Sequence, residues 1–505
     1  MIDQLTEITG QIAGLLWGSP LTLLILLGTG VYLTIRLRFV QVAGFRHSAQ
    51  LISGKYDHPD DSGEVSHFQA LSTALSATIG TGNIAGVATA ISLGGPGALF
   101  WMWITAFIGM ATKFTECSLS LKFREVDENG NTAGGPMYTL LHGLKLKKTA
   151  MAFAFFALIA SFGIGNMVQA NSVVDGLSYL HPDAKNYSWI IGLVMAVMVG
   201  LVILGGVKRI AKVASTIVPF MALLYISAAM IVLFNNMEAL PSALNTIFTH
   251  ALNPWSVGGA AVGEAIRWGV ARGLFSNEAG LGSAPIAHAA AKTNEPVREG
   301  LVAMMGPFID TLVICSMTGL VIIVTGSYID RAEDVVGAAL TAAAFSSELG
   351  DGGAAVVGIG LTLFAFSTII AWSYYGDRSA KFLFGDGAVM PYRVVYTLAV
   401  VVGAAVPLQL VWNIADITNL RIDVYEEGEI FMTLFAPQCF TKKGEVDGKT
   451  VLIAYSDGDV LLDMEQVTIT GKGFRFTSEN NRFELFHESK VLVKESARDM
   501  KGVEL

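Results

Sequence analysis

Two stretches of this sequence combine glycines with polar side chains inside otherwise apolar surroundings. The first runs from Ala77 to Gly86, and the second runs from Gly273 to Pro285. Glycine costs about 1 kcal/mol in a helix interior, and threonine and asparagine side chains compete for backbone hydrogen bonds, so we expect a helix to open at both places. An opened helix presents free backbone amides, which bind anionic groups, and free carbonyls, which bind cations. These stretches are therefore the first candidates for a ligand site.

The composition places these stretches in a membrane. Of the 505 residues, 52% are hydrophobic and only 15% are charged, and the mean hydropathy is +0.54. The charge is uneven, because 27 of the 75 acidic and basic residues lie in 421–505. We therefore expect a lipid-embedded domain over 1–419 and a soluble tail over 420–505. The net charge of −9 argues against nucleic-acid binding, and Cys117, Cys315 and Cys439 have no metal-ligand or disulfide spacing.

Ten segments are long and apolar enough to cross a bilayer, which takes about 20 residues. They are 12–35, 66–93, 97–122, 150–180, 187–206, 213–234, 256–290, 299–326, 354–376 and 391–412. Basic residues cluster in alternate connections, at 36–55, 124–148, 208–212, 292–298 and 378–393, which are therefore expected in the cytoplasm. The N-terminus, and the tail after ten spans, are expected outside. Asp3 and Glu7 replace the basic region of a secretory signal, so we expect the first span to be retained.

The two glycine-rich stretches interrupt spans 66–93 and 256–290, which are five spans apart. Irregular backbone at membrane depth is tolerated only where protein covers it or a cavity adjoins it. Interrupted spans at matching positions are typical of inverted-repeat secondary transporters, which bind substrate and cation at the breaks. The alternative is that the glycines only let helices pack closely, as small-xxx-small patterns do.

A longer motif follows the first interrupted span, Gly-Gly-Pro-Gly-Ala-Leu-Phe-Trp-Met-Trp-Ile-Thr-Ala-Phe-Ile-Gly at 94–109. It resembles the signature of the sodium:alanine symporters, also called alanine or glycine:cation symporters, and further similar runs lie at 80–86, 111–114, 277–285 and 412–416. The resemblance covers about 1–419. It implies an all-α polytopic membrane protein, namely an inverted-repeat helical bundle of the leucine-transporter type with one extra N-terminal span. It also implies uptake of alanine, glycine or a similar small neutral amino acid with sodium or, less often, protons, across the inner membrane of a bacterial-type cell.

An amino-acid zwitterion needs donors for its carboxylate and acceptors for its ammonium in a nearly dry site. We expect the carboxylate at the amides of 80–83 and the Thr81 hydroxyl, with Thr78 as the alternative hydroxyl, and the fold implied by the resemblance places Asn277 at the ammonium. Gln169 is the preferred pocket contact on span four, and Phe275 and Trp372 are expected to close on a methyl group. The expected substrate contacts are thus Thr78, Gly80, Thr81, Gly82, Asn83, Gln169, Phe275, Asn277 and Trp372. The alternatives are interhelical hydrogen bonding for the amides and core packing for the aromatic rings.

Adjacent hydroxyls in the middle of span nine, Ser367 and Thr368, are the candidate cation ligands. The resemblance implies a sodium site where these hydroxyls meet carbonyls of the first broken helix, here those of Ala77 and Gly80. Taken alone, such hydroxyls more often bond back to their own helix. Ionisable residues in a span are functional candidates, and Glu116 and Asp310 are retained for coupling or gating. Ion pairing or snorkelling explains the rest, which are Lys113, Glu264, Arg267, Arg272 and Glu278.

The tail departs from the family. An eleventh apolar span is expected after Asn419, whereas 421–427 reads Arg-Ile-Asp-Val-Tyr-Glu-Glu. Alternating apolar and polar residues at 465–477 predict a small β-rich domain, faintly similar to the strand repeats of periplasmic lipopolysaccharide-export proteins. An external tail is a candidate surface for a protein partner. The missing span and the added domain motivate a second hypothesis, a transporter-like sensor that binds the amino acid without carrying it.

An enzyme is the third class of hypothesis, and the sequence argues against it. The spans contain no His-Glu-x-x-His, no Gly-x-Ser-x-Gly and no phosphate-binding loop. We therefore expect no organic cofactor. The expected partners are the lipid bilayer, a small neutral amino acid and a co-transported sodium ion.

Overall fold

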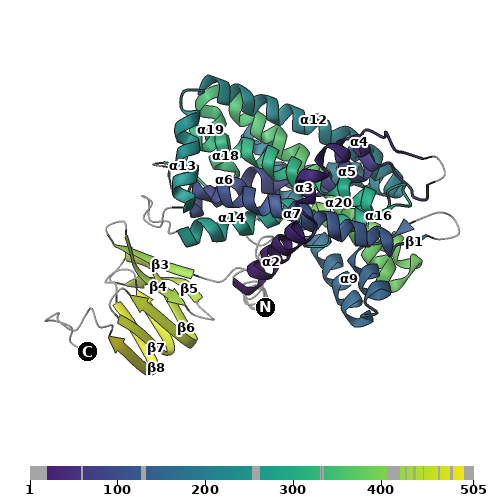
Figure 1. The fold of residues 1–505 in the computed structure, drawn as a ribbon. Helices are drawn as coiled ribbons and strands as arrows, with labels where there is room; N and C mark the ends of the chain where they lie inside the picture. Colours follow the sequence, from purple (N-terminus) through teal and green to yellow (C-terminus); the bar gives the residue numbers. More distant parts are fainter. Residues whose placement is uncertain are drawn as a thin grey trace. The chain divides into compact units, whose positions relative to one another are not determined.

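The computed structural model describes 20–58, 61–126, 132–252, 262–329, 331–332 and 335–406, and, within the tail, 421–426, 429–435, 440–446, 449–464, 467–477 and 482–493. The chain divides into two compact units. One comprises 21–411 and is a helical bundle, and the other comprises 1–20 with 412–505 and contains a β-sheet (Figure 1).

The bundle consists of long apolar helices joined by short ones. The long helical runs are α7 (Gly97–Lys122), α9 (Lys147–Phe162) with η3 (Gly163–Met167) and α10 (Val168–Leu180), η4 (Pro182–Tyr187) with α11 (Ser188–Ile203), α12 (Gly206–Asn235), α16 (Pro296–Ala303) with α17 (Met305–Pro307), η5 (Phe308–Cys315) and α18 (Ser316–Val324), α20 (Asp351–Phe384), and η6 (Asp386–Ala388) with α21 (Val389–Ala405). These are the seven helices in the described residues that are long and apolar enough to span a membrane. The predicted polytopic helical fold is therefore confirmed.

Shorter elements connect these helices. They are α2 (Pro20–Arg36), α3 (Val40–Ala43), α4 (Phe45–Ile52), the hairpin β1 (Glu125–Val126) and β2 (Thr132–Ala133), α8 (Pro136–Tyr138), η2 (Thr139–Gly143), α13 (Leu240–Leu252) and α19 (Ala338–Leu349). The sequence did not predict α13 or α19. Figure 1 shows α13 and α19 at one end of the bundle and the β1–β2 hairpin at the other. We call the end with the hairpin the basic end, because the lysines and arginines of 36–55, 124–148, 292–298 and 378–393 flank the helix termini there.

The first interrupted span is a broken helix. It comprises α5 (His67–Thr78), η1 (Gly82–Gly86) and α6 (Val87–Gly94), with a bend of 54° between the halves. Ser66 and Gln69 form a capping box that fixes where α5 begins. The α5 helix ends at Ile79, whose ψ of 89° leaves the helical region. The carbonyls of the last turn of α5 are thus released from the helical hydrogen-bond pattern.

The second interrupted span is also broken, between α14 (Val262–Asn277) and α15 (Ala284–His288). Three residues of the break have a positive φ: Glu278 at 53°, Gly280 at 86° and Gly282 at 82°. The two glycines adopt a positive φ without steric strain. Glu278 also lies in the left-handed region, which is uncommon for a residue other than glycine. The Asn277 side-chain oxygen accepts a hydrogen bond from the Ala279 amide at 3.0 Å and caps the end of α14.

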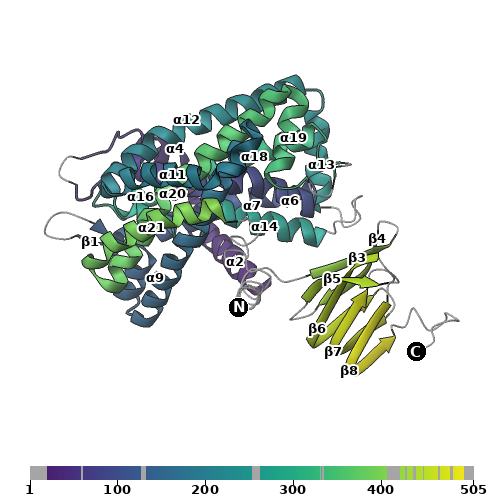
Figure 2. The same cartoon turned by 180° about the vertical axis from the view of Figure 1, so that it is seen from behind.

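The α20 helix passes through the bundle and contacts the helices on which the cavity below depends. It packs against α10, α9, α12, α19 and α5, and Figure 2 shows it from behind, close to α12 and α21. Glycines permit the closest approaches. A side chain at Gly165 would come within 2.5 Å of Trp372, and one at Gly176 within 2.8 Å of the Gly358 carbonyl. Gly176 of α10 and Gly358 of α20 therefore allow these two helices to approach closely.

The tail contains six strands in one antiparallel sheet. They are β3 (Arg421–Glu426), β4 (Glu429–Phe435), β5 (Phe440–Val446), β6 (Lys449–Met464), β7 (Val467–Thr477) and β8 (Arg482–Val493). The order is β3-β4-β6-β7-β8, and β5 also pairs with β6. The motif at 412–416 lies outside the described residues. From 421 onward the described backbone is strand, where a further span was expected from the family.

Candidate functional site

A small polar cavity lies where the two broken helices meet α10 and α20. Its lining residues are Ala77, Thr78, Gly80, Thr81 and Gly82 of the first broken helix, Phe275 and Glu278 of the second, Ile164, Gln169, Thr368 and Trp372. The free space is about 10 Å³, roughly the room of one water molecule. Nine of these residues are among those selected from the sequence. The sequence did not select Ile164, and it assigned Glu278 only to ion pairing.

Glycines at the first break let other helices reach the cavity. A Cβ at Gly80 would lie 2.8 Å from Thr368 Oγ1 and 3.3 Å from Gln169 Oε1. A Cβ at Gly82 would lie 3.5 Å from the Phe275 ring, in ordinary contact. Gly80 therefore has no space for a side chain, because the hydroxyl of α20 and the amide of α10 already occupy the adjacent positions.

Gln169 presents an acceptor that the described residues leave unused. Its Nε2 donates to the Ile164 carbonyl at 3.1 Å and to Thr81 Oγ1 at 3.4 Å. These donations fix the orientation of the amide, since a flipped amide would place an oxygen against the Ile164 carbonyl. Its Oε1 is buried without a hydrogen-bond partner in the described part of the chain. A buried acceptor of this kind favours a ligand that brings a donor or a positive charge.

The hydroxyls of α20 meet the end of α5. Thr368 Oγ1 lies 3.0 Å from the Ser76 carbonyl and 3.4 Å from the Ile79 carbonyl. Ser367 Oγ lies 3.4 Å from the same Ser76 carbonyl, and Ser76 Oγ donates to the Ser367 carbonyl at 2.8 Å. The sequence suggested the carbonyls of Ala77 and Gly80 for this contact. Both of those residues line the cavity, but the hydroxyl contacts are with Ser76 and Ile79.

Asp310 ties both breaks together from η5. Its carboxylate is fully buried and accepts hydrogen bonds from Asn83 Nδ2 at 2.6 Å, Ser276 Oγ at 2.8 Å and Thr311 Oγ1 at 2.7 Å. Asn83 in turn accepts from the Gly80 amide at 2.9 Å. The structure thus places Asn83 between the first break and Asp310 and not on the cavity wall. A single carboxylate therefore contacts both broken helices.

Asn277 is likewise held away from the cavity lining. Its Nδ2 donates to Thr311 Oγ1 at 3.3 Å, and its oxygen caps Ala279. The resemblance implied that this side chain meets the ammonium group of the substrate. In the structure, the Asn277 side chain instead forms hydrogen bonds with Thr311 and with the Ala279 amide within the break.

The second break is also held from α7. Lys113 is buried, and its Nζ donates to the Glu278 carbonyl at 3.2 Å and lies 3.7 Å from Glu116 Oε1. The Glu116 carboxylate also interacts electrostatically with the backbone amides of Gly280 and Gly282. Glu278 accepts a short hydrogen bond from Ser283. Glu116 therefore lies beside the irregular backbone at 280–282, with the buried Lys113 as its charged neighbour.

Two broken helices around a small polar cavity, with hydroxyls and released carbonyls beside it, define a secondary transporter. A sequence model of the sodium:alanine symporter family matches 2–432, and the chain belongs to this family. It is an integral membrane protein that transports amino acids with a cation, and it is not an enzyme. Family membership confirms the resemblance and supports transport over the binding-only sensor.

Three relatives are similar to this chain over most of their length. The chain is 50% identical over 421 residues to the sodium/alanine symporter AgcS of Methanococcus maripaludis, covering 82% of this chain and 91% of AgcS. It is 40% identical to the "Probable sodium/glutamine symporter GlnT" of Bacillus subtilis, covering 82% and 85%. It is 36% identical to the amino-acid carrier protein AlsT of Bacillus subtilis, covering 78% and 82%. A solved structure of MhsT in complex with L-phenylalanine is similar with a TM-score of 0.49 at 14% identity, covering 68% of this chain and 80% of that one.

Proposed function

We propose that the protein is a sodium-coupled symporter for alanine, glycine or a similar small neutral amino acid, working by alternating access around the two broken helices. The cavity carries this proposal, because it combines an unused buried acceptor, a helix break with exposed backbone and two aromatic side chains within one small space. The relative AgcS is named for sodium and alanine.

The substrate's two charges have matching groups at the cavity. The amides at the start of η1, at Thr81 and Gly82, lie at the N-terminal end of a helical segment, where a carboxylate is favoured. The Thr78 and Thr81 hydroxyls are further donors. Gln169 Oε1 is the proposed acceptor for the ammonium group. Asn83 and Asn277 are assigned to holding the breaks in shape, because both use their side chains away from the cavity.

The sodium ion is proposed to bind between α5 and α20. Hydroxyl and carbonyl oxygens are suitable ligands for a hard cation, and those of Thr368, Ser367, Ser76 and Ile79 converge there. The two hydroxyls now lie within hydrogen-bond distance of these carbonyls and of the Phe364 carbonyl on their own helix, so an ion would replace hydroxyl-to-carbonyl bonds by coordination. The substrate cavity shares Thr368 and Gly80 with this region. Occupation of one site therefore shapes the other.

Substrate size is proposed to be limited by Phe275 and Trp372. The cavity has room for about one water molecule, so any substrate must displace side chains. A hydrogen or methyl substituent requires the smallest displacement, which favours glycine and alanine over larger amino acids.

The orientation proposed from charge places the basic end in the cytoplasm. The N-terminus is then outside, as is the tail, which offers a surface for a protein partner. The membrane is proposed to be the inner membrane of a bacterial-type cell.

Binding of alanine and of glycine to the purified protein, with and without sodium at constant ionic strength, tests the proposal. We expect sodium to tighten binding about tenfold or more, which corresponds to roughly 1.4 kcal/mol of coupling. Sodium-driven accumulation of labelled alanine in proteoliposomes then separates a symporter from a sensor, because a sensor binds without concentrating. Absence of binding of either amino acid under every ion condition would contradict the proposal.

A further inference from the structure

At the basic end, one buried carboxylate joins both broken helices. Glu299 of α16 has no exposed surface. It accepts a short hydrogen bond from Nδ1 of His67, the first residue of α5. It accepts a second one from Nδ1 of His288, the last residue of α15, at 2.5 Å. Both histidines are 1% exposed. The start of α5 and the end of α15 are therefore both hydrogen bonded to the same carboxylate.

The backbone beside these histidines makes a second connection. Val65 and Ala291 form a parallel β-bridge. The Lys292 amide donates to the Val65 carbonyl at 2.7 Å, and the Glu64 amide donates to the Ala290 carbonyl at 2.8 Å. This bridge joins the chain entering the first broken helix to the chain leaving the second.

Arg124, just beyond the end of α7, makes a third connection. Its guanidinium donates to the carbonyls of Ala289, Ala291 and Thr293 and to that of Ser62, at 2.7 to 2.9 Å. The Arg124 guanidinium is therefore hydrogen bonded both to the segment before α5 and to the segment after α15. Hydrogen bonds from a charged donor are roughly twice as strong as those between neutral groups.

Charged side chains surround these contacts. Asp57 Oδ1 lies 3.9 Å from His67 Nε2. Burial lowers the pKa of Arg124, and the carboxylates of Glu299, Asp61 and Glu64 oppose that shift. Arginine keeps its positive charge inside proteins, so Arg124 balances the charge of the buried Glu299.

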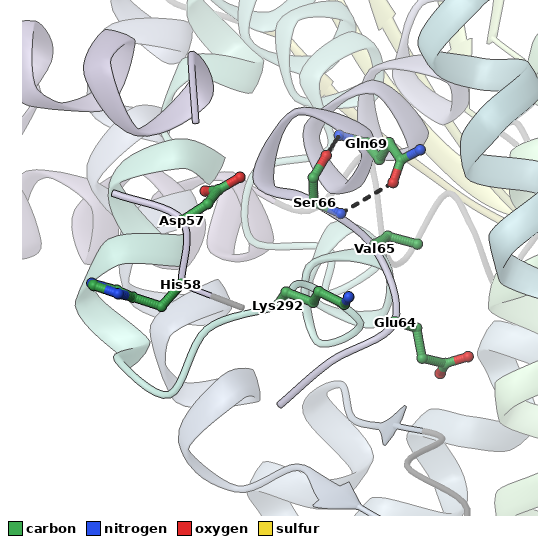
Figure 3. Close-up of a pocket in the computed structure, with 7 residues that line it drawn as sticks. All are labelled: Asp57, His58, Glu64, Val65, Ser66, Gln69 and Lys292. Atoms are coloured by element: carbon green, nitrogen blue, oxygen red, sulfur yellow. Dashed lines mark hydrogen bonds between the residues drawn. The ribbon is translucent and has the colours of Figure 1, made fainter. Parts of the chain in front are cut away.

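A water-accessible cavity of about 390 Å³ reaches the backbone bridge at Val65 and Lys292 from the surface (Figure 3). Its wall includes Val65, Ser66 and Lys292, together with the charged Asp57 and Glu64. Figure 3 shows the Ser66 and Gln69 capping box at the start of α5 on the same wall. The α5 helix begins at this cavity and ends at the substrate cavity, so the histidine and bridge contacts lie between the two.

We propose that these contacts form the inner gate of the transport cycle. By inner gate we mean the bonds of Glu299 to His67 and His288, the Val65–Ala291 bridge and the Arg124 guanidinium. Opening it joins the surface cavity of Figure 3 to the substrate cavity and releases the amino acid to the cytoplasm. The inference rests on the proposed alternating access. A polar gate suits this task, because water solvates Glu299 and the imidazoles when they part, whereas a buried charge left dry would be far more costly.

A reversible cross-link across the bridge tests the gate. Paired strands lie about 4.8 Å apart, within the Cα range that a disulfide needs, so a Val65→Cys, Ala291→Cys pair can close. The matched control is Glu125→Cys with Ala133→Cys, which are paired within the single hairpin β1–β2. We expect oxidation of the first pair to lower alanine transport at least about tenfold while alanine binding changes less than about twofold, with recovery on reduction. Unchanged transport after complete cross-linking, shown by mass spectrometry, overturns the proposal.

A second experiment needs no substrate, so it judges the gate even if alanine proves not to bind. Cys117 of α7 is fully buried and belongs to the same apolar cluster as Val65, Ala290 and Ala291. Glu299→Gln should raise the rate of Cys117 labelling by N-ethylmaleimide about tenfold, read peptide by peptide. The control is Glu125→Gln, which alters the exposed His142–Glu125 pair at 2.7 Å and should change nothing. Equal labelling in a folded Glu299→Gln protein contradicts the gate.

Discussion

The Thr368 hydroxyl lies 3.0 Å from the Ser76 carbonyl oxygen, across the contact between α20 and the last turn of α5. It also lies 3.4 Å from the carbonyl of Ile79, where the helix stops. These oxygens come from two helices that are far apart in sequence. A cation bound among them would hold α20 against the first broken helix. Gly80, which lacks space for a Cβ beside the same hydroxyl, lines the cavity between the broken helices. Coupling between ion and substrate thus has a short physical path.

Replacing Thr368 by valine should weaken sodium dependence. The change keeps the side-chain shape but removes the hydroxyl, which costs about 1–3 kcal/mol when a buried partner is left unmet. We expect the sodium concentration for half-maximal alanine binding to rise about tenfold or more. Thr368→Ser should retain most of the sodium response.

Thr362→Val is the matched control on α20. Thr362 carries a buried hydroxyl with no hydrogen-bond partner among the described residues, and it does not line the cavity. Its sodium response should equal that of the parent protein. An unchanged sodium response in Thr368→Val would remove this hydroxyl from the cation site.

A methyl group at Gly80 should close the site. In Gly80→Ala the added Cβ would lie 2.8 Å from Thr368 Oγ1. Cβ atoms in proteins essentially never approach another heavy atom that closely. Thr368 or Gln169 must then move, and we expect alanine binding, measured by isothermal titration, to fall more than about tenfold. Gly86→Ala is the control on the same broken helix, because a Cβ there meets nothing within 4 Å. Parent-like affinity in Gly80→Ala would show that this contact does not define the cavity.

The sequence predicted the cavity because its signal is local. Glycines beside Thr78 and Thr81, and adjacent hydroxyls at Ser367 and Thr368, mark helix breaks and polar positions inside apolar spans wherever the chain folds. Five of the lining residues, Thr78, Gly80, Thr81, Gly82 and Thr368, carry this signal. The sequence could not predict where each of these side chains points. Asn83 looked like a ligand contact from its position, yet its amide bonds Asp310.

The contacts at the basic end could not be predicted from the sequence, and the reason is different. His67 and Glu299 are 232 residues apart, and neither lies in a motif that signals the other. Their meeting depends on how the two broken helices cross α16, which is a property of tertiary packing. The α13 and α19 helices were missed because, at 13 and 12 residues, they are too short to span a bilayer.

Shortening Phe275 should broaden the substrate range. The ring lines the cavity, and Phe275→Ala creates space beside Gly82. We expect weaker alanine binding, by about 1–3 kcal/mol for lost apolar contact, and better competition by glutamine than in the parent protein. Competition against labelled alanine measures both effects. Phe248→Ala, at a ring that is 45% exposed, is the control. If Phe275→Ala left the ratio of glutamine to alanine binding unchanged, this ring would not set substrate size.

Neutralising Asp310 should uncouple sodium from substrate. Its carboxylate accepts from Asn83 on the first broken helix and from Ser276 on the second. In Asp310→Asn one oxygen becomes a donor, so at least one of these donors loses its acceptor, and the connection between the breaks weakens. We expect the sodium effect on alanine affinity, about tenfold in the parent protein, to fall below about threefold. The readout is the ratio of dissociation constants with and without sodium, which a loss of folded protein alone does not change.

Asp351→Asn, at the exposed start of α20, should leave this ratio unaltered. A full sodium effect in Asp310→Asn would mean that coupling runs through Thr368 without this carboxylate.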